Sequence, residues 1–184
     1  MEIRQSFSNQ LLVALPALKG DYFEGSVSLL VDHNDDGAFG LMINRPLKTR
    51  LVELFPDLAG RFDCPVMEGG PVEQNRVFFL HEAGPVFEST FVIGDEVALT
   101  TSADFIDAMK AREAPERSLA LLGYAGWSAH QLEHEIAEDV WLLTPASKAI
   151  VFDVAFEERA VSAAAMLGVD LNLLSSAPGT DQEH

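Results

Sequence analysis

One run of residues has the spacing of a zinc peptidase motif. Residues 130–134 (His-Gln-Leu-Glu-His) fit the pattern H-x-x-E-H, in which two histidines bind zinc and the glutamate acts as base. At about 100° per residue in a helix, His130, Glu133 and His134 lie opposite the apolar side chains of this segment and face solvent. A catalytic zinc needs a dry, shaped cavity. We therefore interpret the three as a solvated polar face, and a metal-dependent hydrolase stays an alternative function.

Two hydroxyl residues, Thr101 and Ser102, precede the expected start of a helix, where backbone N–H groups favour anions. Ser102 is expected to cap that helix, and Asp104 in its first turn complements the helix dipole. A Ser or Thr nucleophile would also need a base within hydrogen-bond reach. A hydroxyl-based hydrolase is therefore a second alternative, after capping.

A small-molecule cleft is predicted where residues 123–127 (Gly-Tyr-Ala-Gly-Trp) join a strand to a helix. The glycines permit close backbone approach, and Tyr124 and Trp127 offer flat apolar surfaces with polar tips. Gln131 and Glu135, one helical turn apart, occupy the flank of the helix, where side chains can face a cleft. Packing of both aromatic residues in the core is the alternative.

Two isolated histidines are further candidates. His33 lies at a hairpin and His81 ends a strand, so each could be a ligand or a pH-dependent switch, or a hydrogen-bonded structural group. Gly69 and Gly70 precede Pro71 in a turn that lacks the Lys-Ser/Thr of a P-loop, which argues against nucleotide binding through this turn.

Composition restricts the class of protein. The 184 residues carry 12 Lys and Arg against 29 Asp and Glu, a net charge of −17, which disfavours direct binding to DNA. The densest basic stretch, Arg45, Lys48 and Arg50, is interpreted as solvated charge after a strand. Cys64 is the single cysteine, so an intrachain disulfide and a cysteine-based zinc knuckle are excluded. With neither a long apolar segment nor a signal peptide, we expect a cytoplasmic protein without membrane contact.

The clearest structural signal is a hairpin over residues 26–44, because two apolar runs flank an Asp-Gly turn. Many expected strands follow one another without a helix between them, which indicates a mixed α+β fold in one domain, residues 1–174, with a polar tail at 175–184. Strands are expected at 10–18, 26–33, 39–44, 62–67, 76–81, 89–93, 96–100, 117–124, 140–144 and 148–152. Helices are expected at 50–58, from 102, from 128 to about 138, and at 156–167, with Gly168 as the left-handed C-terminal residue.

Taken in order, these motifs resemble the AlgH/YqgE family over nearly the whole chain. The resemblance implies a largely antiparallel, bifurcated β-sheet with a small barrel, surrounded by helices. It also implies a bacterial protein of unknown function or a transcriptional regulator, because some members affect exopolysaccharide gene expression, and it brings no established catalysis. The family pattern includes Gln131, Glu133 and Glu135 without requiring His130 or His134. The residues that carry the resemblance are Leu15-Pro16, Phe23, Ser26-Val27, His33-Asn34, Gly37–Gly40, Asn44-Arg45-Pro46, Gly69–Val72, Arg76, Leu80-His81, Thr101-Ser102, Gly123–Trp127, Gln131–Glu135, Trp141 and Leu167–Asp170.

The sequence thus favours a binding or regulatory protein whose partner is a small ligand or another protein, with any effect on transcription indirect. We expect no catalytic residue, metal or cofactor, and Arg45 is the expected anion-pairing group. Polar and glycine motifs concentrate at the ends of expected elements, where binding sites tend to lie. The predicted cleft is lined by His33, Asn44, Arg45, Gly69, Gly70, His81, Thr101, Ser102, Tyr124, Trp127, Gln131 and Glu135.

Overall fold

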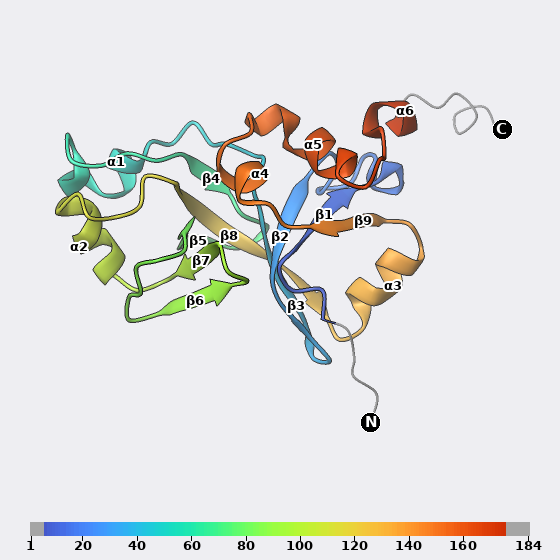
Figure 1. Cartoon of the computed structure of the whole chain (residues 1–184), viewed down its shortest axis with the longest axis horizontal. Helices are drawn as coiled ribbons and strands as arrows, with labels where there is room; N and C mark the ends of the chain where they lie inside the picture. The colour runs from blue at the N-terminus through green and yellow to red at the C-terminus, as the bar shows by residue number, and fades with distance from the viewer. Residues whose placement is uncertain (1–5, 176–184) are drawn as a thin grey trace.

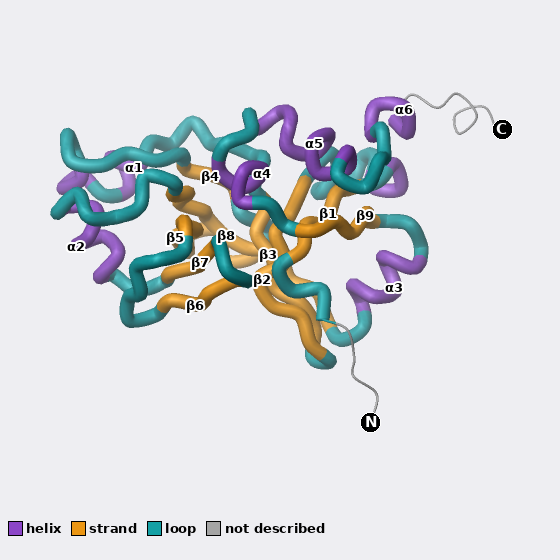
Figure 2. Tube along the Cα trace, viewed as in Figure 1, coloured by secondary structure: helices purple, strands orange, loops and turns teal. Residues whose placement is uncertain are grey.

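A curled, mostly antiparallel sheet forms the centre of the protein. The computed structural model describes residues 6–175. Within them the strands follow the order β6-β7-β5-β8-β3-β2-β1-β9, and β4 pairs in parallel with β8 (Figures 1 and 2). The α+β prediction is confirmed. The strands are β1 Gln10–Ala14, β2 Val27–Asn34, β3 Gly37–Met42, β4 Val66–Glu68, β5 Val72–Glu82, β6 Thr90–Ile93, β7 Val97–Thr100, β8 Ser118–Ser128 and β9 Trp141–Pro145.

Strand β8 belongs to both halves of the sheet. Its first residues pair with β4 and β5, and its last residues, from Ala125 to Ser128, pair with β3. Gly123, with φ +76°, lies between the two stretches, and this left-handed conformation is one that glycine adopts without strain. A Cβ atom at Gly70 would lie 2.0 Å from the carbonyl carbon of Tyr124. Glycine is therefore needed in both segments that meet where the sheet divides, at Gly123 in β8 and at Gly70 between β4 and β5.

The predicted hairpin is confirmed as β2 and β3. Asn34 Oδ1 accepts a hydrogen bond from the Asp36 N–H at 2.7 Å, which closes the turn. At Gly37, φ is +140° and a Cβ atom would lie 2.2 Å from the Trp127 carbonyl oxygen. This close approach holds the hairpin tip against the end of β8, where Gly37 pairs with Ser128.

Helices surround the sheet on several sides. Figure 1 shows α1 and α2 at one end of the molecule, α3 at the opposite end, and α4 to α6 along one side. The helices are α1 Leu51–Leu54, α2 Asp104–Lys110, α3 Gln131–Ala137, α4 Lys148–Phe152, α5 Arg159–Ala165 and α6 Leu171–Ser175, with 3₁₀ turns η1 Pro16–Leu18, η2 Pro56–Leu58 and η3 Phe156–Glu158. Among the described residues, no helix has the length and apolar character needed to cross a membrane.

Several predicted elements are corrected. The predicted strand at 148–152 is helix α4, because Ser147 Oγ accepts a hydrogen bond from the Ile150 N–H and caps a helix there. Residues 123–127 lie inside β8 and do not connect a strand to a helix. The helix predicted at 156–167 consists of η3 and α5, and Gly168 has the expected positive φ of +73°. Helix α6 was not predicted, and residues 176–184 of the predicted tail lie outside the described residues.

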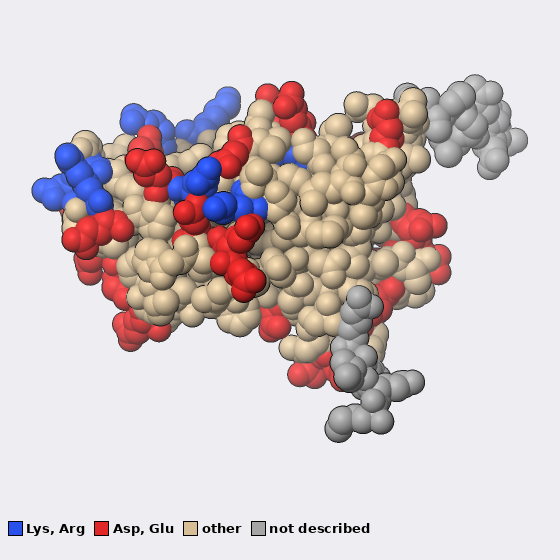
Figure 3. Space-filling model, viewed as in Figure 1, with Lys and Arg blue, Asp and Glu red and all other residues tan. Residues whose placement is uncertain are grey.

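Charge is unevenly distributed over the surface. On the face shown in Figure 3, most Lys and Arg side chains lie over the half of the molecule that carries α1 and α2, whereas Asp and Glu occur around the whole outline. The two ends also have separate apolar clusters. Phe105 and Leu51 are buried in the cluster near α1 and α2, and Trp127, Trp141 and Leu132 in the cluster under α3.

Candidate functional site

The structure divides the twelve predicted cleft residues among three places. His81 pairs with Ser118 near the start of β8, and Trp127 lies nine positions further along this strand. At about 3.3 Å per residue, this corresponds to roughly 30 Å measured along the strand. The prediction of a single cleft is therefore corrected. The first group is His33, Trp127, Gln131 and Glu135, the second is Asn44, Arg45, Gly69, Gly70 and Tyr124, and the third is His81, Thr101 and Ser102.

The Glu135 carboxylate is the centre of the first group. Its Oε1 accepts hydrogen bonds from the indole N–H groups of Trp127 at 2.9 Å and Trp141 at 3.0 Å, and its Oε2 accepts one from Gln131 at 3.1 Å. Gln131 Oε1 in turn accepts the Ser128 N–H at 2.9 Å. These bonds fasten α3 to β8 and β9, so the cluster is a structural brace.

His33 has a partner on each ring nitrogen. Nδ1 accepts the Phe7 N–H at 2.9 Å, so the ring proton lies on Nε2, which donates to Glu133 Oε1 at 3.0 Å. The Phe7 ring stacks on the imidazole with centroids 4.7 Å apart. Burial raises the pKa of Glu133, but the hydrogen bond from His33 lowers it, with a net decrease. Since both nitrogens are engaged, His33 is not available as a general base.

The zinc peptidase geometry is not formed. His130 is the N-cap residue of α3 and has a left-handed φ of +66°, so it lies outside the regular helix, although its carbonyl oxygen accepts the His134 N–H at 3.1 Å. Its Nδ1 lies 3.5 Å from Glu133 Oε2, and the other oxygen of Glu133 is bonded to His33. The described residues contain no group of three or more His, Cys, Asp or Glu side chains arranged to hold a metal. The donor set therefore does not fit zinc.

The second group supports the loop before β2. Asn44 accepts the Val27 N–H at 3.0 Å and donates to the Gly25 carbonyl at 2.9 Å. Arg45 Nη2 donates to the carbonyl oxygens of Tyr22 at 2.6 Å and Glu24 at 3.0 Å. The predicted anion-pairing guanidinium is thus already occupied by backbone oxygens.

The same guanidinium has two further contacts in this group. It lies 5.1 Å above the Tyr22 ring and 3.6 Å from Glu68. Burial and the hydrogen bond with Glu68 raise the pKa of Tyr22 to about 12. Gly69 and Gly70 have a different role, because they pack against the backbone of β8 where the sheet divides. Tyr124 packs its ring on Phe39, with centroids 4.8 Å apart.

The third group contains a threonine–histidine pair that the sequence did not indicate. Thr100 Oγ1 lies 2.8 Å from His81 Nε2, and His81 Nδ1 lies 2.9 Å from the Glu82 carbonyl oxygen. The carbonyl can only accept, so Nδ1 carries the proton and Nε2 accepts from Thr100. Both residues are 0% exposed, and burial lowers the pKa of His81. The pair has hydrogen-bond geometry, but no substrate can reach it.

Thr101 and Ser102 differ from this buried pair. Thr101 is exposed. Ser102 Oγ accepts the Ser89 N–H at 3.0 Å and donates to Asp104. The predicted capping role of Ser102 is therefore wrong, because its hydroxyl connects the start of α2 to the loop before β6. Cys64 is a buried free thiol, and burial together with nearby Asp63 raises its pKa to about 12.

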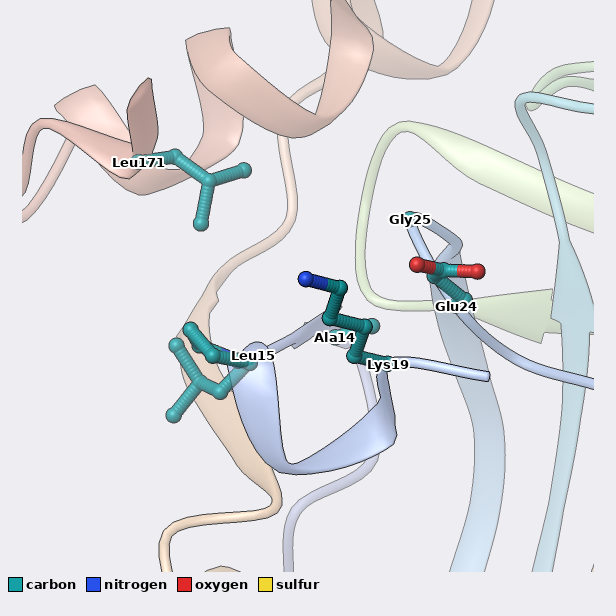
Figure 4. Close-up of a pocket in the computed structure, with 7 residues that line it drawn as sticks. Ala14, Leu15, Lys19, Glu24, Gly25 and Leu171 are labelled. Carbon is teal, nitrogen blue, oxygen red and sulfur yellow. The ribbon is translucent and has the colours of Figure 1, made fainter. Parts of the chain in front are cut away.

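A pocket lies at the end of β1, outside the predicted residues. Its volume is about 260 Å³, and Figure 4 shows the Lys19 amino group between Leu171 and Glu24. Neither Lys19 nor Glu24 has an ion-pair partner within the described part of the chain. Leu171 comes from α6, about 150 positions along the chain, so no local pattern could connect it to this loop. The lining residues are Ala14, Leu15, Pro16, Lys19, Glu24, Gly25 and Leu171.

The comparison with known families agrees with the fold. The model of the AlgH-like family, DUF179, matches residues 11–172. This chain belongs to the AlgH-like family. A relative in Nitrosococcus oceani, a UPF0301 protein, is 43% identical over 180 residues, covering 94% of this chain and 96% of the relative. The resemblance read from the sequence is confirmed.

Two solved structures resemble this AlgH-like chain. The solution structure of AlgH from Pseudomonas aeruginosa matches with a TM-score of 0.76 at 40% identity, covering 97% of this chain and 99% of that one. A crystal structure of a protein from Corynebacterium diphtheriae matches with a TM-score of 0.75 at 20% identity, covering 96% and 95%. The second likeness concerns the fold alone. The mostly antiparallel, curled sheet with its helices therefore matches the solved structure of AlgH.

Proposed function

We propose that this AlgH-like protein binds a small ligand without catalysis, and that any effect on transcription is indirect. The observation that carries the proposal is the pocket at the end of β1. Its apolar lining and two opposite charges, Lys19 and Glu24, have the composition of a small-molecule site. A ligand bound there would contact α6 and the loop before β2 together, so binding could change the surface offered to a protein partner.

The lining defines the chemistry of the ligand. A carboxylate would pair with Lys19 and an ammonium group with Glu24, and an aliphatic middle would lie against Leu15 and Leu171. Lys19 and Glu24 are not paired with each other, because their charged atoms do not approach within ion-pair distance. The ligand class that fits best is a small zwitterion with its charges at opposite ends of an apolar chain.

The hydrogen bonding of the polar candidates supports binding over catalysis. His33 uses both ring nitrogens, and the Thr100–His81 pair is buried. A hydrolase would need at least one such group free and accessible to substrate. The net charge of −17 supports an indirect route to any transcriptional effect, because a DNA-binding module normally presents a basic face.

A ligand with two separated charges tests this proposal. We would titrate the full chain with 6-aminohexanoate and follow backbone amide shifts by NMR, with hexanoate and hexylamine as analogues that lack one charge. The expected shifts lie around the pocket, and Lys19→Gln or Glu24→Gln should each weaken binding roughly tenfold. Arg76→Gln, which removes an exposed charge elsewhere, is the matched control. Equal binding of all three compounds, or no shift at millimolar 6-aminohexanoate, would contradict the proposal.

A further inference from the structure

A second hollow lies between the segment after β3 and the segment that leads into β4. Its volume is about 460 Å³, and a neighbouring hollow of about 400 Å³ shares Arg50 and Asp63 with it. We call the two together the basic groove. The larger part is lined by Pro46, Leu47, Lys48, Thr49, Arg50, Asp63, Cys64, Pro65, Val66 and Phe156, and the smaller part by Arg50, Gly60, Arg61, Phe62 and Asp63.

Three cations follow the length of this groove. Lys48 and Arg50 are exposed, whereas Thr49 between them is half-buried, so the two charged side chains are turned toward the open side. Arg61 continues the row in the smaller part. The Lys48 and Arg50 side chains have no ion-pair partner in the described part of the chain, although Glu53 Oε2 accepts the Arg50 backbone N–H at 2.6 Å and Asp63 lines both hollows.

A buried guanidinium adds positive charge behind one wall of the groove. The Arg159 Cζ lies 4.6 Å from the centre of the Phe156 ring, and Phe156 lines the groove. Arg159 is 2% exposed and donates to two carbonyl oxygens, those of Ile43 at 2.6 Å and Val154 at 2.8 Å. No carboxylate lies within ion-pair distance of it among the described residues. The guanidinium is thus a buried positive charge on the far side of the Phe156 ring, where solvent screens it weakly.

Burial does not discharge this group at neutral pH. It lowers the pKa of Arg159 to about 10, with nearby Asp153 acting in the opposite direction. The side chain is thus still protonated under ordinary conditions. It also fixes Phe156 by stacking on its ring, which keeps a flat apolar wall beside the cations.

We propose that the basic groove binds a small molecule that carries two or more phosphate groups. Cations spaced along two adjoining hollows suit anionic groups spaced along one ligand, and the Arg50 guanidinium can donate hydrogen bonds to two phosphate oxygens. The Phe156 wall suits a flat apolar part of the same molecule. A nucleic-acid duplex fits less well, because it would extend beyond the groove onto acidic surface. This site is separate from the pocket at Lys19 and does not depend on its occupancy.

A titration with three compounds tests the ligand class. Pyrophosphate supplies the anionic groups alone, adenosine supplies a flat base alone, and ATP supplies both. We expect amide shifts at residues 46–50 and 61–66 with pyrophosphate and ATP, tighter binding of ATP, and weak or no binding of adenosine. Affinity should fall with added salt, because the contacts are ionic. No shift in the groove at millimolar pyrophosphate and low salt, or tighter binding of a duplex oligonucleotide than of ATP, would overturn the proposal.

Charge-removing variants locate the site. Lys48→Gln and Arg50→Gln should each weaken ATP binding roughly tenfold, and both side chains are exposed, so the fold should tolerate the changes. Arg76→Gln removes the same charge outside the groove and should leave ATP affinity unchanged. An equal loss in all three variants would show a general effect of net charge and would overturn the site. Binding of 6-aminohexanoate should be unaffected by Arg50→Gln, so failure of one proposal is distinguishable from failure of the other.

Discussion

A histidine lies in a hydrogen-bonded network near each end of β8, His33 from β2 at one end and His81 from β5 at the other. The two networks differ in whether their acceptor groups are ionised. At the α3 end, carboxylates accept the hydrogen bonds, with Glu133 bonded to His33 and Glu135 to two indoles. At the α2 end, His81 is bonded to the hydroxyl of Thr100 and to a carbonyl oxygen. The Glu133 side chain is 36% exposed, whereas His81 and Thr100 are 0% exposed. Ionised acceptors are used where water can reach them, and neutral ones where it cannot.

This comparison explains why residue type alone was a poor guide to a site. A histidine next to a hydroxyl group or a carboxylate is the usual composition of a catalytic dyad. Here one pair lacks access for substrate and the other lacks a free ring nitrogen. Both networks hold strands and helices in place. Substitutions at Glu135, Thr100 and His81 should therefore reduce stability, with the largest loss at the α3 end.

Glu135→Ala should have the largest effect. The substitution leaves the indole N–H groups of Trp127 and Trp141 without their charged acceptor, which should reduce the free energy of unfolding by about 3 kcal/mol. Urea unfolding followed by tryptophan fluorescence measures it. Glu135→Gln keeps an acceptor oxygen and should lose about 1 kcal/mol, and Glu138→Ala, at an exposed position, is the matched control. If Glu135→Ala unfolds like the control, the brace at the α3 end is not stabilising.

Thr100→Val should have a smaller effect at the α2 end. Valine has a similar shape but cannot donate to His81 or interact with the Thr90 hydroxyl 2.8 Å away. We expect a loss of about 2 kcal/mol in the free energy of unfolding, because buried polar atoms lose their partners. Thr101→Val, at the exposed neighbouring position, provides the comparison and should change stability little. Equal losses in the two variants would show that burial of this pair has no energetic consequence.

The smallest expected effect is the pH dependence that His81 contributes. Burial lowers its pKa in the folded protein below the ordinary value of 6.5, so as pH falls the unfolded chain takes up the proton first. The contribution of His81 to the free energy of unfolding is therefore complete above pH 6.5, and it decreases as the pH falls below that value. The difference in the free energy of unfolding between wild type and His81→Gln should shrink from pH 7.5 to pH 5.5. A constant difference would mean that the pKa of His81 is unchanged by folding.

Local patterns predicted the sheet well because the sheet contains strong local signals. The hairpin turn at Asn34–Gly37 depends on neighbouring residues and was correctly predicted. Helix α4 was predicted as a strand because Ile150 and Val151 favour strands, and the cap from Ser147 outweighed that preference. Gly69 and Gly70 were predicted as turn and cleft residues, and Gly123 as part of a junction between a strand and a helix. The reason for glycine at these positions is contact between two backbones at the division of the sheet, which a single sequence does not show.

The two candidate binding sites could not be predicted from the sequence. The pocket at Lys19 is completed by Leu171, and the basic groove by Phe156, both from the last third of the chain. Such pairs meet only through the tertiary fold. Lys48 and Arg50 were recognised as the densest basic stretch, but their hollow and the buried Arg159 behind it were not foreseeable. Sequence therefore located some of the charges, and the fold determined which of them share a surface.

The position of β8 in the chain has a consequence for synthesis on the ribosome. Its partners β3, β4 and β5 all precede it, and it contacts both halves of the sheet. Until Ser128 has emerged, the nascent chain contains a β1–β2–β3 unit and a β5–β6–β7 unit, which contact each other only through the segments after β3 and around β4 and lack the strand that pairs with both. Each has an unpaired edge that could associate with other chains. We therefore expect the growing polypeptide to be most prone to aggregation just before β8 is complete, and most in need of chaperones at that length.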